Sequence, residues 1–295
     1  MRAFVEFSQQ VLSGAALGCI YGLIALGFVL IYKATEVVNF AQGELMMLGA
    51  FLGYTFISLF GLPFWFGLPL AVVCMAGIGG LLDRIVVRPI VGQPVFAIIM
   101  VTLGMGFVAR SGASLVPAWG VDTHVFSTPF TGKAVSIGPL VASHDQLAIM
   151  ATTAVLVAVL FLFFRYTRIG IAMQAASQNQ LAAYYVGIPV KTICSLVWGL
   201  SAAVAAVAGI LLAPIVLVHA NMGFIGLKAF PAAVLGGFGS IPGAIAGGLI
   251  IGVVESLAGF YLPEGFKDVA AYVVLLLVLA IRPQGLFGES LRKKV

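Results

Sequence analysis

The run VLSGAALGCIYGLIALGFVLIY, residues 11–32, decides the class of fold. None of its 22 residues is Asp, Glu, Lys or Arg. A helix needs about 20 consecutive apolar residues to cross a bilayer, because the hydrocarbon core is about 30 Å thick. The run is too long for the hydrophobic part of a signal peptide and has no clear cleavage site before Lys33. We therefore expect residues 11–32 to form the first span of a membrane protein.

The composition of the whole chain supports this class. Of the 295 residues, 62% are hydrophobic and 8% are charged, whereas soluble domains have about 25% charged residues. A soluble protein of this length could not cover its surface with 15 basic and 10 acidic side chains. Cys19, Cys74 and Cys194 lie singly in apolar segments, so we expect them to pack and predict no metal site.

Further apolar runs of similar length indicate a helix bundle, because each suits one pass through the bilayer. They predict an all-α integral membrane protein with about eight transmembrane helices, in a single domain over residues 1–295. The runs lie near residues 10–32, 44–60, 63–82, 94–113, 146–164, 192–218, 241–261 and 267–281.

The distribution of basic residues predicts which ends of the spans face the cytoplasm, because Lys and Arg are enriched in cytoplasmic loops. It places the C-terminus and the loop 166–191 inside, and the N-terminus and residues 114–145 outside. Such an arrangement requires an odd number of crossings, so one further crossing is hidden. The basic residues are Arg84, Arg88, Arg165, Arg168, Lys191, Arg282, Arg292, Lys293 and Lys294.

The stretch LKAFPAAVLGGFGSIPGAIAGG, residues 227–248, is the best candidate for that crossing. Its Pro and Gly residues interrupt an apolar segment, which predicts a short broken or re-entrant helix near 229–240 followed by a full span. Irregular backbone at membrane depth must be buried in protein or line a cavity, so we expect a translocation pathway or gate here. Close helix packing through small residues is the alternative. The residues concerned are Phe230, Gly236, Gly237, Phe238, Gly239 and Ser240.

Polar residues inside apolar runs are further pathway candidates. Asn39, Gln42, Gly43 and Glu44 lie at the start of the second run, where a helical turn would present polar groups to the bundle interior. A capped helix start is the alternative. Glu255 lies deeper in an apolar run than any other carboxylate. Because ionisable groups at depth mark a pathway or a buried partner, we expect Glu255 to be shielded from lipid and held by a polar group.

The stretch RIGIAMQAASQNQLAAYYVGIPVK, residues 168–191, is too polar to span and lacks the charges of an ordinary solvated helix. We expect one helix of about 24 Å between Gly170 and Gly187. Its small side chains would let another protein approach closely, whereas a helix on a lipid surface normally carries Lys and Arg. We therefore favour a helix that docks on another protein over a helix that lies on the lipid surface. The docking candidates are Gly170, Ala172, Ala175, Ala176, Asn179, Gln180, Ala183 and Gly187.

Motifs for ATP hydrolysis are absent from the sequence. The segment TGKAV, residues 131–135, lacks the upstream glycine and the hydroxyl residue of a phosphate-binding loop. No nucleophile, base and orienting residue stand out as a set. We therefore predict a non-catalytic membrane subunit.

Three segments make the chain recognisable. They are GLIALGFVLIYKATEVVNFAQGELMMLGAF, LKAFPAAVLGGFGSIPGAIAGGLIIGVVES and FKDVAAYVVLLLVLAIRPQGLFG. They closely resemble the permease subunits of the branched-chain amino acid ABC importers, the Liv type, and the chain is similar to the smaller H-type subunit. The resemblance implies that the segment 168–189 carries the coupling helix that inserts into an ATPase subunit.

The resemblance also implies partners and a location. The partners are a second, M-type permease, two cytoplasmic subunits that bind ATP and Mg²⁺, and an extracytoplasmic solute-binding protein. This chain would bind no cofactor and no nucleic acid, and would lie in the lipid bilayer of the bacterial inner membrane. It would carry branched-chain or related amino acids by alternating access, although family members also carry urea and short amides. An ion-coupled secondary transporter and a gated channel are alternatives of other classes.

Overall fold

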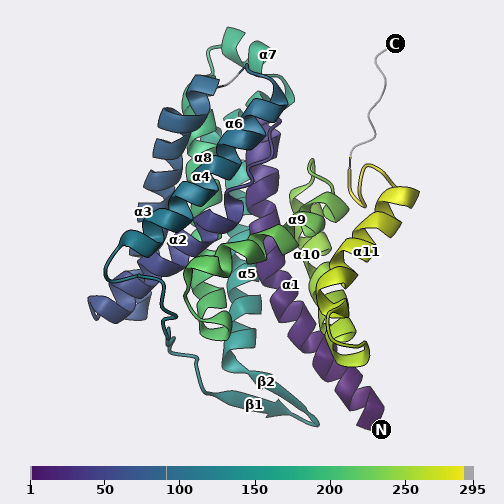
Figure 1. The fold of residues 1–295 in the computed structure, drawn as a ribbon. Helices are drawn as coiled ribbons and strands as arrows, with labels where there is room; N and C mark the ends of the chain where they lie inside the picture. The colour runs from purple at the N-terminus through teal and green to yellow at the C-terminus, as the bar shows by residue number, and fades with distance from the viewer. Residues whose placement is uncertain (1, 91, 289–295) are drawn as a thin grey trace.

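The computed structural model describes residues 2–90 and 92–288, and these form a helix bundle with one small hairpin (Figure 1). The long helices are α1 (Arg2–Thr35), α3 (Phe64–Leu82), α4 (Val95–Leu115), α5 (His144–Tyr166), α8 (Val190–Val216) and α10 (Ile241–Tyr261). The shorter helices are α2 (Gln42–Tyr54), α6 (Arg168–Gln178), α7 (Gln180–Tyr185), α9 (Ile225–Gly236) and α11 (Phe266–Ile281). Short π or 3₁₀ turns are η1 (Thr55–Leu59), η2 (Asp83–Val87), η3 (Arg88–Ile90) and η4 (Ala220–Phe224). Arg292, Lys293 and Lys294 lie outside the described residues.

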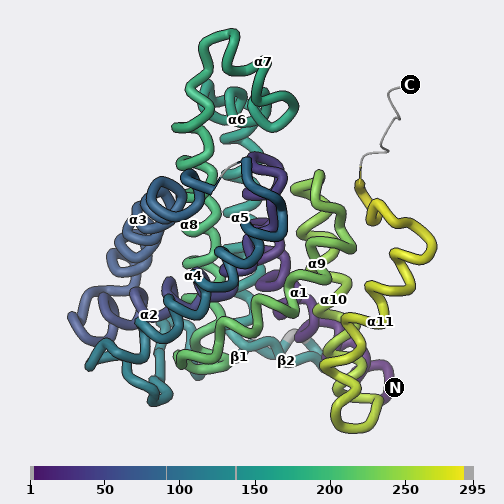
Figure 2. Tube along the Cα trace, turned by 45° about the horizontal axis from the view of Figure 1, so that its top comes forward, coloured from purple at the N-terminus to yellow at the C-terminus, as the bar shows by residue number. Residues whose placement is uncertain are grey.

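The bundle has two ends that can be told apart by contacts. At one end, which we call the hairpin end, the side chain of Gln9 near the start of α1 pairs with both backbone groups of Val141. At the opposite end, called the α7 end, the Gln180 amide donates to the carbonyl oxygen of Ala34 at 2.6 Å, close to where α1 finishes. Figure 2 shows α6 and α7 extending beyond the other helices at this end.

All eight predicted apolar runs fall in helices, so the all-α membrane class is confirmed. Among the described residues, six helices are long and apolar enough to cross a membrane: α1, α3 with its π and 3₁₀ extension, α4, α5, α8 and α10. The expectation of about eight full spans is therefore slightly high. The runs 44–60 and 267–281 form shorter pieces, because α2 is followed by the π-helical turn η1 and α11 has 16 residues.

Where the extra crossing was expected, η4 and α9 together form a shorter apolar segment, Ala220–Gly236. Just before them, Val218 forms a two-way backbone bridge with His124 in the loop that leads to the hairpin. Just after them, the Phe238 ring lies 4.8 Å from the Tyr32 ring near the α7 end of α1. The segment therefore runs between the two ends of the bundle with a helix shorter than the six candidate spans. The helix begins at Ile225, a few residues before the predicted start, and Gly237 with φ +94° ends it before α10.

Helices α1 and α10 pack through glycine. Gly14, Gly18 and Gly22 on α1 face Gly248 and Gly252 on α10 at four-residue spacing. A Cβ atom added to Gly18 would lie 2.7 Å from the Cα atom of Leu249. Such small residues let two membrane helices bring their backbones together, where van der Waals contact drives association. The small-residue packing that was the alternative for this part of α10 is therefore present.

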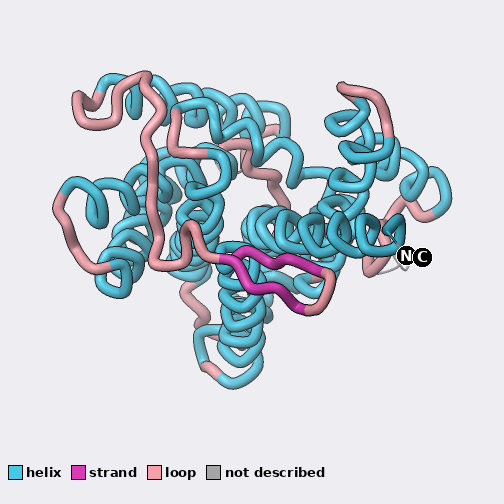
Figure 3. The backbone as a smooth tube through the Cα atoms, turned by 90° about the horizontal axis from the view of Figure 1, so that it is seen from below, coloured by secondary structure: helices cyan, strands magenta, loops and turns pink. Residues whose placement is uncertain are grey.

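The hairpin was not expected from the sequence. Strands β1 (Ala134–Ile137) and β2 (Leu140–Ser143) pair antiparallel, with Ala134 opposite Ser143 (Figure 3). Ser143 then starts α5, because its side chain accepts from the Gln146 backbone N–H at 3.1 Å and the Gln146 side chain accepts from the Ser143 backbone. This capping box satisfies two donors that a helix start leaves free. The pairing with Gln9 holds the hairpin beside the first helix.

Candidate functional site

The segment at the α7 end consists of two helices, so the expected single helix between Gly170 and Gly187 is wrong. Asn179 has an extended backbone, with φ −158° and ψ 100°, which interrupts the helical hydrogen bonding. Its side chain accepts from the Ala182 N–H at 2.9 Å and so caps α7. An asparagine cap gives the backbone an alternative to continuing the first helix. The two short helices can therefore lie in different directions.

The small side chains proposed for docking divide between the two faces of α6 and α7. Ala176 and Ala183 are each 3% exposed and pack against the rest of the chain, so the expectation that they contact a partner is wrong. Gly170 is buried too, because a Cβ atom there would overlap the Phe163 carbonyl in α5. Ala172 and Ala175 are half-buried. Asn179, Gln180 and Gly187 are exposed.

Large apolar side chains occupy the free face of α7 instead. Leu181, Tyr184, Tyr185 and Val186 are between 65% and 77% exposed. No charged residue occurs from 169 to 190. Exposed apolar patches of this kind mark interaction surfaces. The α7 face, which we define as these four residues, is therefore the part of the segment available to a partner.

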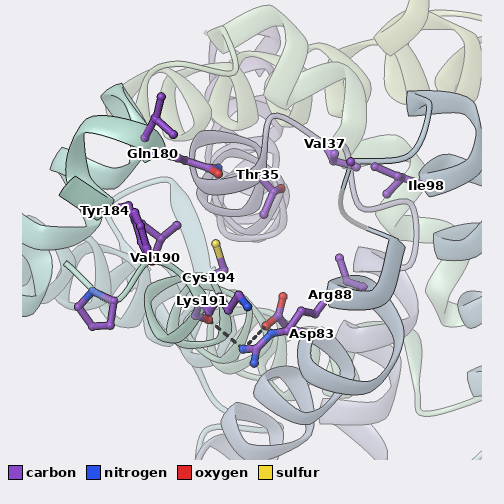
Figure 4. A pocket seen from close by; sticks show the side chains of 14 residues that line it. Thr35, Val37, Asp83, Arg88, Ile98, Gln180, Tyr184, Val190, Lys191 and Cys194 are labelled. Carbon is purple, nitrogen blue, oxygen red and sulfur yellow. Dashed lines mark hydrogen bonds and ion pairs between the residues drawn. The ribbon is translucent and has the colours of Figure 1, made fainter. Parts of the chain in front are cut away.

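A cavity of about 870 Å³ lies beside α7, between the end of α1, the start of α4 and the start of α8 (Figure 4). Thr35 and Gln180 contribute to its walls, and Leu181 and Tyr184 of the α7 face border it as well. On one wall, the Arg88 guanidinium donates to the Lys191 carbonyl at 2.9 Å and to Ser195 at 2.6 Å. These bonds tie the turn after α3 to α8. The cavity was not expected from the sequence.

The polar residues around the start of α2 form a buried cluster inside the bundle. Asn39 and Gln42 have no exposed surface, and the Gln42 side-chain oxygen accepts from Ser201 on α8 at 3.1 Å. Ser201 also lies 3.0 Å from the Gly27 carbonyl. A Cβ atom at Gly27 would overlap the Gln42 amide. Asn39 accepts from the Ala41 N–H at 3.1 Å in a local turn, but the N-cap of α2 is Ala41 and has no side-chain cap, so the capped helix start that was the alternative for Asn39 is not observed.

Glu44 forms an ion pair that sequence reasoning missed. Its carboxylate accepts from the guanidinium of Arg110 on α4, and both side chains are largely buried. The neighbouring Gly43 lets α2 approach η4, because a Cβ atom there would overlap the Gly223 carbonyl. Since a buried pair carries no net charge, Glu44 does not present a free negative charge to the bundle interior.

Glu255 is 2% exposed and has two partners, so the expectation of a shielded, polar-held carboxylate is confirmed. The Tyr21 hydroxyl donates to one carboxylate oxygen at 2.6 Å, and the Lys228 ammonium lies 3.2 Å from the other. Lys228 also contacts Asp268 at the start of α11 at 2.5 Å. These bonds join α1, α9, α10 and α11.

The broken segment combines tight packing with an aromatic cluster. Phe230 lies 5.8 Å from Phe28, 5.6 Å from Phe40 and 5.8 Å from Phe238, measured between ring centroids. Gly236 is packed, because a Cβ atom there would overlap the Gly243 carbonyl.

The turn after α9 is built by small residues. Gly237 has a positive φ, Gly239 is exposed, and Ser240 caps α10 by accepting from the Gly243 N–H at 3.1 Å. The Phe238 ring in this turn lies 4.8 Å from the Tyr32 ring near the end of α1, which links the turn to that helix.

The sequence contains a pattern that could have identified the basic partners of Glu44 and Glu255. Arg110 stands alone inside the apolar run 94–113, and Lys228 stands alone before the run that α10 forms. A lone cation at membrane depth implies a nearby anion. Within residues 2–90 and 92–288 no group of three His, Cys, Asp or Glu side chains could hold a metal ion.

Comparison with known proteins fits this helical, membrane-spanning arrangement. A family model described as branched-chain amino acid transport system / permease component matches residues 10–279. LivH of Salmonella typhimurium strain LT2, a high-affinity branched-chain amino acid transport system permease protein, is 34% identical over 99% of both chains. BraD of Pseudomonas aeruginosa, which has the same description, is 31% identical over 100% of both chains. LivM of Escherichia coli K12 is 27% identical over 92% of this chain and 68% of its own length. The chain belongs to the family of permease components of branched-chain amino acid transport systems.

Proposed function

We propose that this chain is the membrane subunit of an ATP-driven importer for branched-chain or related amino acids in the bacterial inner membrane. A second, M-type permease completes the translocation pathway, and an extracytoplasmic binding protein delivers the substrate. Two cytoplasmic subunits bind ATP and Mg²⁺, and this chain binds no cofactor. The descriptions of LivH and BraD support the substrate class. Urea or a short amide is the alternative substrate.

The observation that carries the proposal is the α7 face. It exposes Leu181, Tyr184, Tyr185 and Val186 at the end of the bundle, on a segment without charged residues. A helix that lies on lipid normally carries Lys and Arg on its polar face. The absence of these residues favours a protein partner for α7, and we assign that role to an ATPase subunit.

The position of α7 supports a coupling role. Gln180 is bonded to the end of α1, and Gln180 and Tyr184 form part of the wall of the 870 Å³ cavity. A partner that shifts α7 therefore changes the cavity at the same end of the bundle. Such a mechanical link is what alternating access requires of a subunit that does not itself hydrolyse ATP.

The buried charges do not favour an ion-coupled transporter. Glu44 is paired with Arg110, and Glu255 with Lys228. A coupling ion needs a carboxylate that can exchange partners during the cycle. In this structure both deep carboxylates already contact a basic side chain, so the energy source is better assigned to ATP.

The test compares two arginine substitutions at opposite ends of the molecule. Val186 on the α7 face is 77% exposed, and Val125 in the loop before the hairpin is 74% exposed. We expect Val186→Arg to weaken association with the ATPase subunits by about tenfold or more, while Val125→Arg leaves it unchanged. The measurements are co-purification of the ATPases and ATP hydrolysis stimulated by substrate-loaded binding protein. Normal values in Val186→Arg would place α7 on lipid, where arginine strengthens attachment.

A further inference from the structure

A small apolar cluster borders the 870 Å³ cavity at the α7 end. Ile31 on α1, Val87 in η2 and Trp198 on α8 are at most 3% exposed and form a cluster separate from the main core. Met105 on α4 packs against them. Val87 also lines the cavity, so the cluster and the cavity are direct neighbours. We call these four residues the plug.

Helix α1 shows what lies on the two sides of the plug. Thr35 lines the cavity (Figure 4), and Ile31 of the plug comes one turn further from the α7 end. Gly27 comes one turn further again, and its carbonyl oxygen accepts from Ser201 in the buried polar cluster at 3.0 Å. The four-residue spacing keeps Thr35, Ile31 and Gly27 on one face of the helix.

Helix α8 has the same order in the opposite chain direction. Cys194 lines the cavity, and Trp198 of the plug follows one turn later. Ser201 comes next, and its hydroxyl lies 3.1 Å from the Gln42 side-chain oxygen. A helix advances about 10 Å over the seven residues from Cys194 to Ser201. One layer of apolar side chains therefore separates the cavity from the polar cluster.

Two buried N–H groups at the plug and behind it lack a protein partner. Among the described residues, no group accepts from the Trp198 indole N–H or from the Gln42 amide. A buried donor without an acceptor is unfavourable, and contact with water relieves it. The closed arrangement of the plug therefore carries a cost that a hydrated, open arrangement does not.

Helix α4 supplies the wall of the plug that can move most easily. It buries four of its 21 residues, and Met105 is half-buried. Trp198, in contrast, lies on a helix that packs closely on α3, because a Cβ atom at Gly79 would lie 2.6 Å from the Trp198 carbonyl oxygen. An outward shift of α4 would withdraw Met105 and leave Trp198 in place.

The position of Val87 depends on its neighbour Arg88. The Arg88 guanidinium donates to the Lys191 carbonyl at 2.9 Å and to the Ser195 hydroxyl at 2.6 Å, both near the start of α8. Ser195 in turn donates to Asp83 at 2.6 Å. The start of α8 follows α7 closely in the chain. A shift of α7 therefore acts on the bonds that hold Val87 in the plug.

We infer that the plug is a gate, which separates the 870 Å³ cavity from the buried polar cluster and opens when Met105 and Val87 move away from Trp198. An apolar constriction of this kind excludes water and polar solutes until it widens. The gate deepens the proposed function and rests on it, because it assumes that an ATPase subunit acts on α7.

The test follows three single cysteines in vesicles. Cys194 reports on the cavity, Ser201→Cys on the level behind the plug, and the buried Cys19 on the packed core. In each variant the other native cysteines are replaced by serine. The assembled complex is placed in inside-out vesicles that enclose substrate-loaded binding protein, and a membrane-impermeant thiol reagent is added outside with or without ATP.

The gate predicts a different response at each cysteine. We expect Cys194 to react under both conditions, Ser201→Cys to react severalfold faster with ATP, and Cys19 to stay unreactive. Equal rates for Ser201→Cys with and without ATP would overturn the gate. The same acceleration at Cys19 would overturn it too, because the whole bundle would then be loosening.

A second comparison needs no ATP. Trp198→Ala removes the largest side chain of the plug, whereas Leu212→Ala removes a buried side chain of the main core on the same helix. Both substitutions leave a void. We expect Trp198→Ala alone to make Ser201→Cys react severalfold faster in the resting complex. An unchanged rate in Trp198→Ala, or an equal increase in Leu212→Ala, would show that the plug is ordinary packing.

The gate and the proposed function fail in different ways. If the wild-type complex takes up leucine with ATP but Ser201→Cys reacts alike with and without ATP, the gate is wrong and the importer stands. If Trp198→Ala exposes Ser201→Cys but no ATPase subunit associates with the chain, the plug still closes the cavity and the ATP-driven function is wrong.

Discussion

At the scale of single residues, the Glu255 cluster allows a sharp prediction. Glu255→Leu removes the acceptor of the Tyr21 hydroxyl and one of the two anions beside Lys228. Breaking a buried pair in this way costs about 3 kcal/mol. Glu255→Gln keeps a carbonyl oxygen for Tyr21 and should cost clearly less.

The measurement for Glu255 is thermal unfolding of the purified protein in detergent. Glu6→Leu, at an exposed carboxylate near the start of α1, is the control and should change the unfolding free energy by less than about 0.5 kcal/mol. Wild-type stability in Glu255→Leu would show that the bonds to Tyr21 and Lys228 contribute little.

The sequence predicted the environment of Glu255 but not its partners. Depth within an apolar run follows from counting residues, and depth alone implies burial against a polar group. Tyr21 is 234 positions away, and its position beside Glu255 depends on how α1 and α10 pack. The same limit applies to Arg110, whose pairing with Glu44 requires α4 to cross α2.

At the scale of elements, the seam between α1 and α10 predicts a contrast between two glycines. Gly18→Ala places a methyl group 2.7 Å from the Leu249 Cα atom, so the helices must separate. Overpacking of this kind costs about 1–3 kcal/mol. Gly104→Ala, in α4, meets no atom within 4 Å and should be neutral or stabilise the helix.

Both glycine variants are compared by their unfolding midpoints in detergent. Equal midpoints for Gly18→Ala and Gly104→Ala would mean that the α1–α10 contact adjusts freely to an added methyl group.

Helices could be predicted where the length and apolar character of a segment determine them. They were harder to predict where individual hydrogen bonds determine where an element begins or ends. Every apolar run became a helix, but the break at Asn179 arises from a side-chain cap, and asparagine is also tolerated inside helices. The position of the hairpin beside α1 involves Gln9, which bonds to Val141 across 132 positions. The sequence indicated small-residue packing at Gly248 and Gly252, yet not that Gly14, Gly18 and Gly22 would face it.

At the scale of the whole molecule, the two ends of the bundle predict a labelling pattern. In a cysteine-free background, Ser136→Cys on β1 should react with a membrane-impermeant thiol reagent in intact spheroplasts. Gln178→Cys at the end of α6 should react only after permeabilisation, because the positions lie at opposite ends of the bundle. Both side chains are exposed.

The labelling is done in cells without the ATPase subunits, so that no partner covers Gln178→Cys. Reaction of Gln178→Cys in intact spheroplasts would place α7 outside the cell and remove it as an ATPase contact. The expected pattern would fix the sidedness that the basic residues indicate.

The Glu44–Arg110 pair has a consequence for how the chain enters the membrane during synthesis. Chains are made from the N-terminus, and Arg110 follows Glu44 by 66 positions. While those residues are being translated, the carboxylate of Glu44 has no guanidinium beside it, although a charge in hydrocarbon costs a few kcal/mol. For Glu255 the order of synthesis is the opposite, because its partners Tyr21 and Lys228 are both made before it. We therefore expect α2 to reach its final position only after α4 has emerged from the ribosome. Helix α10, in contrast, can insert directly against Tyr21 and Lys228, which have already been made.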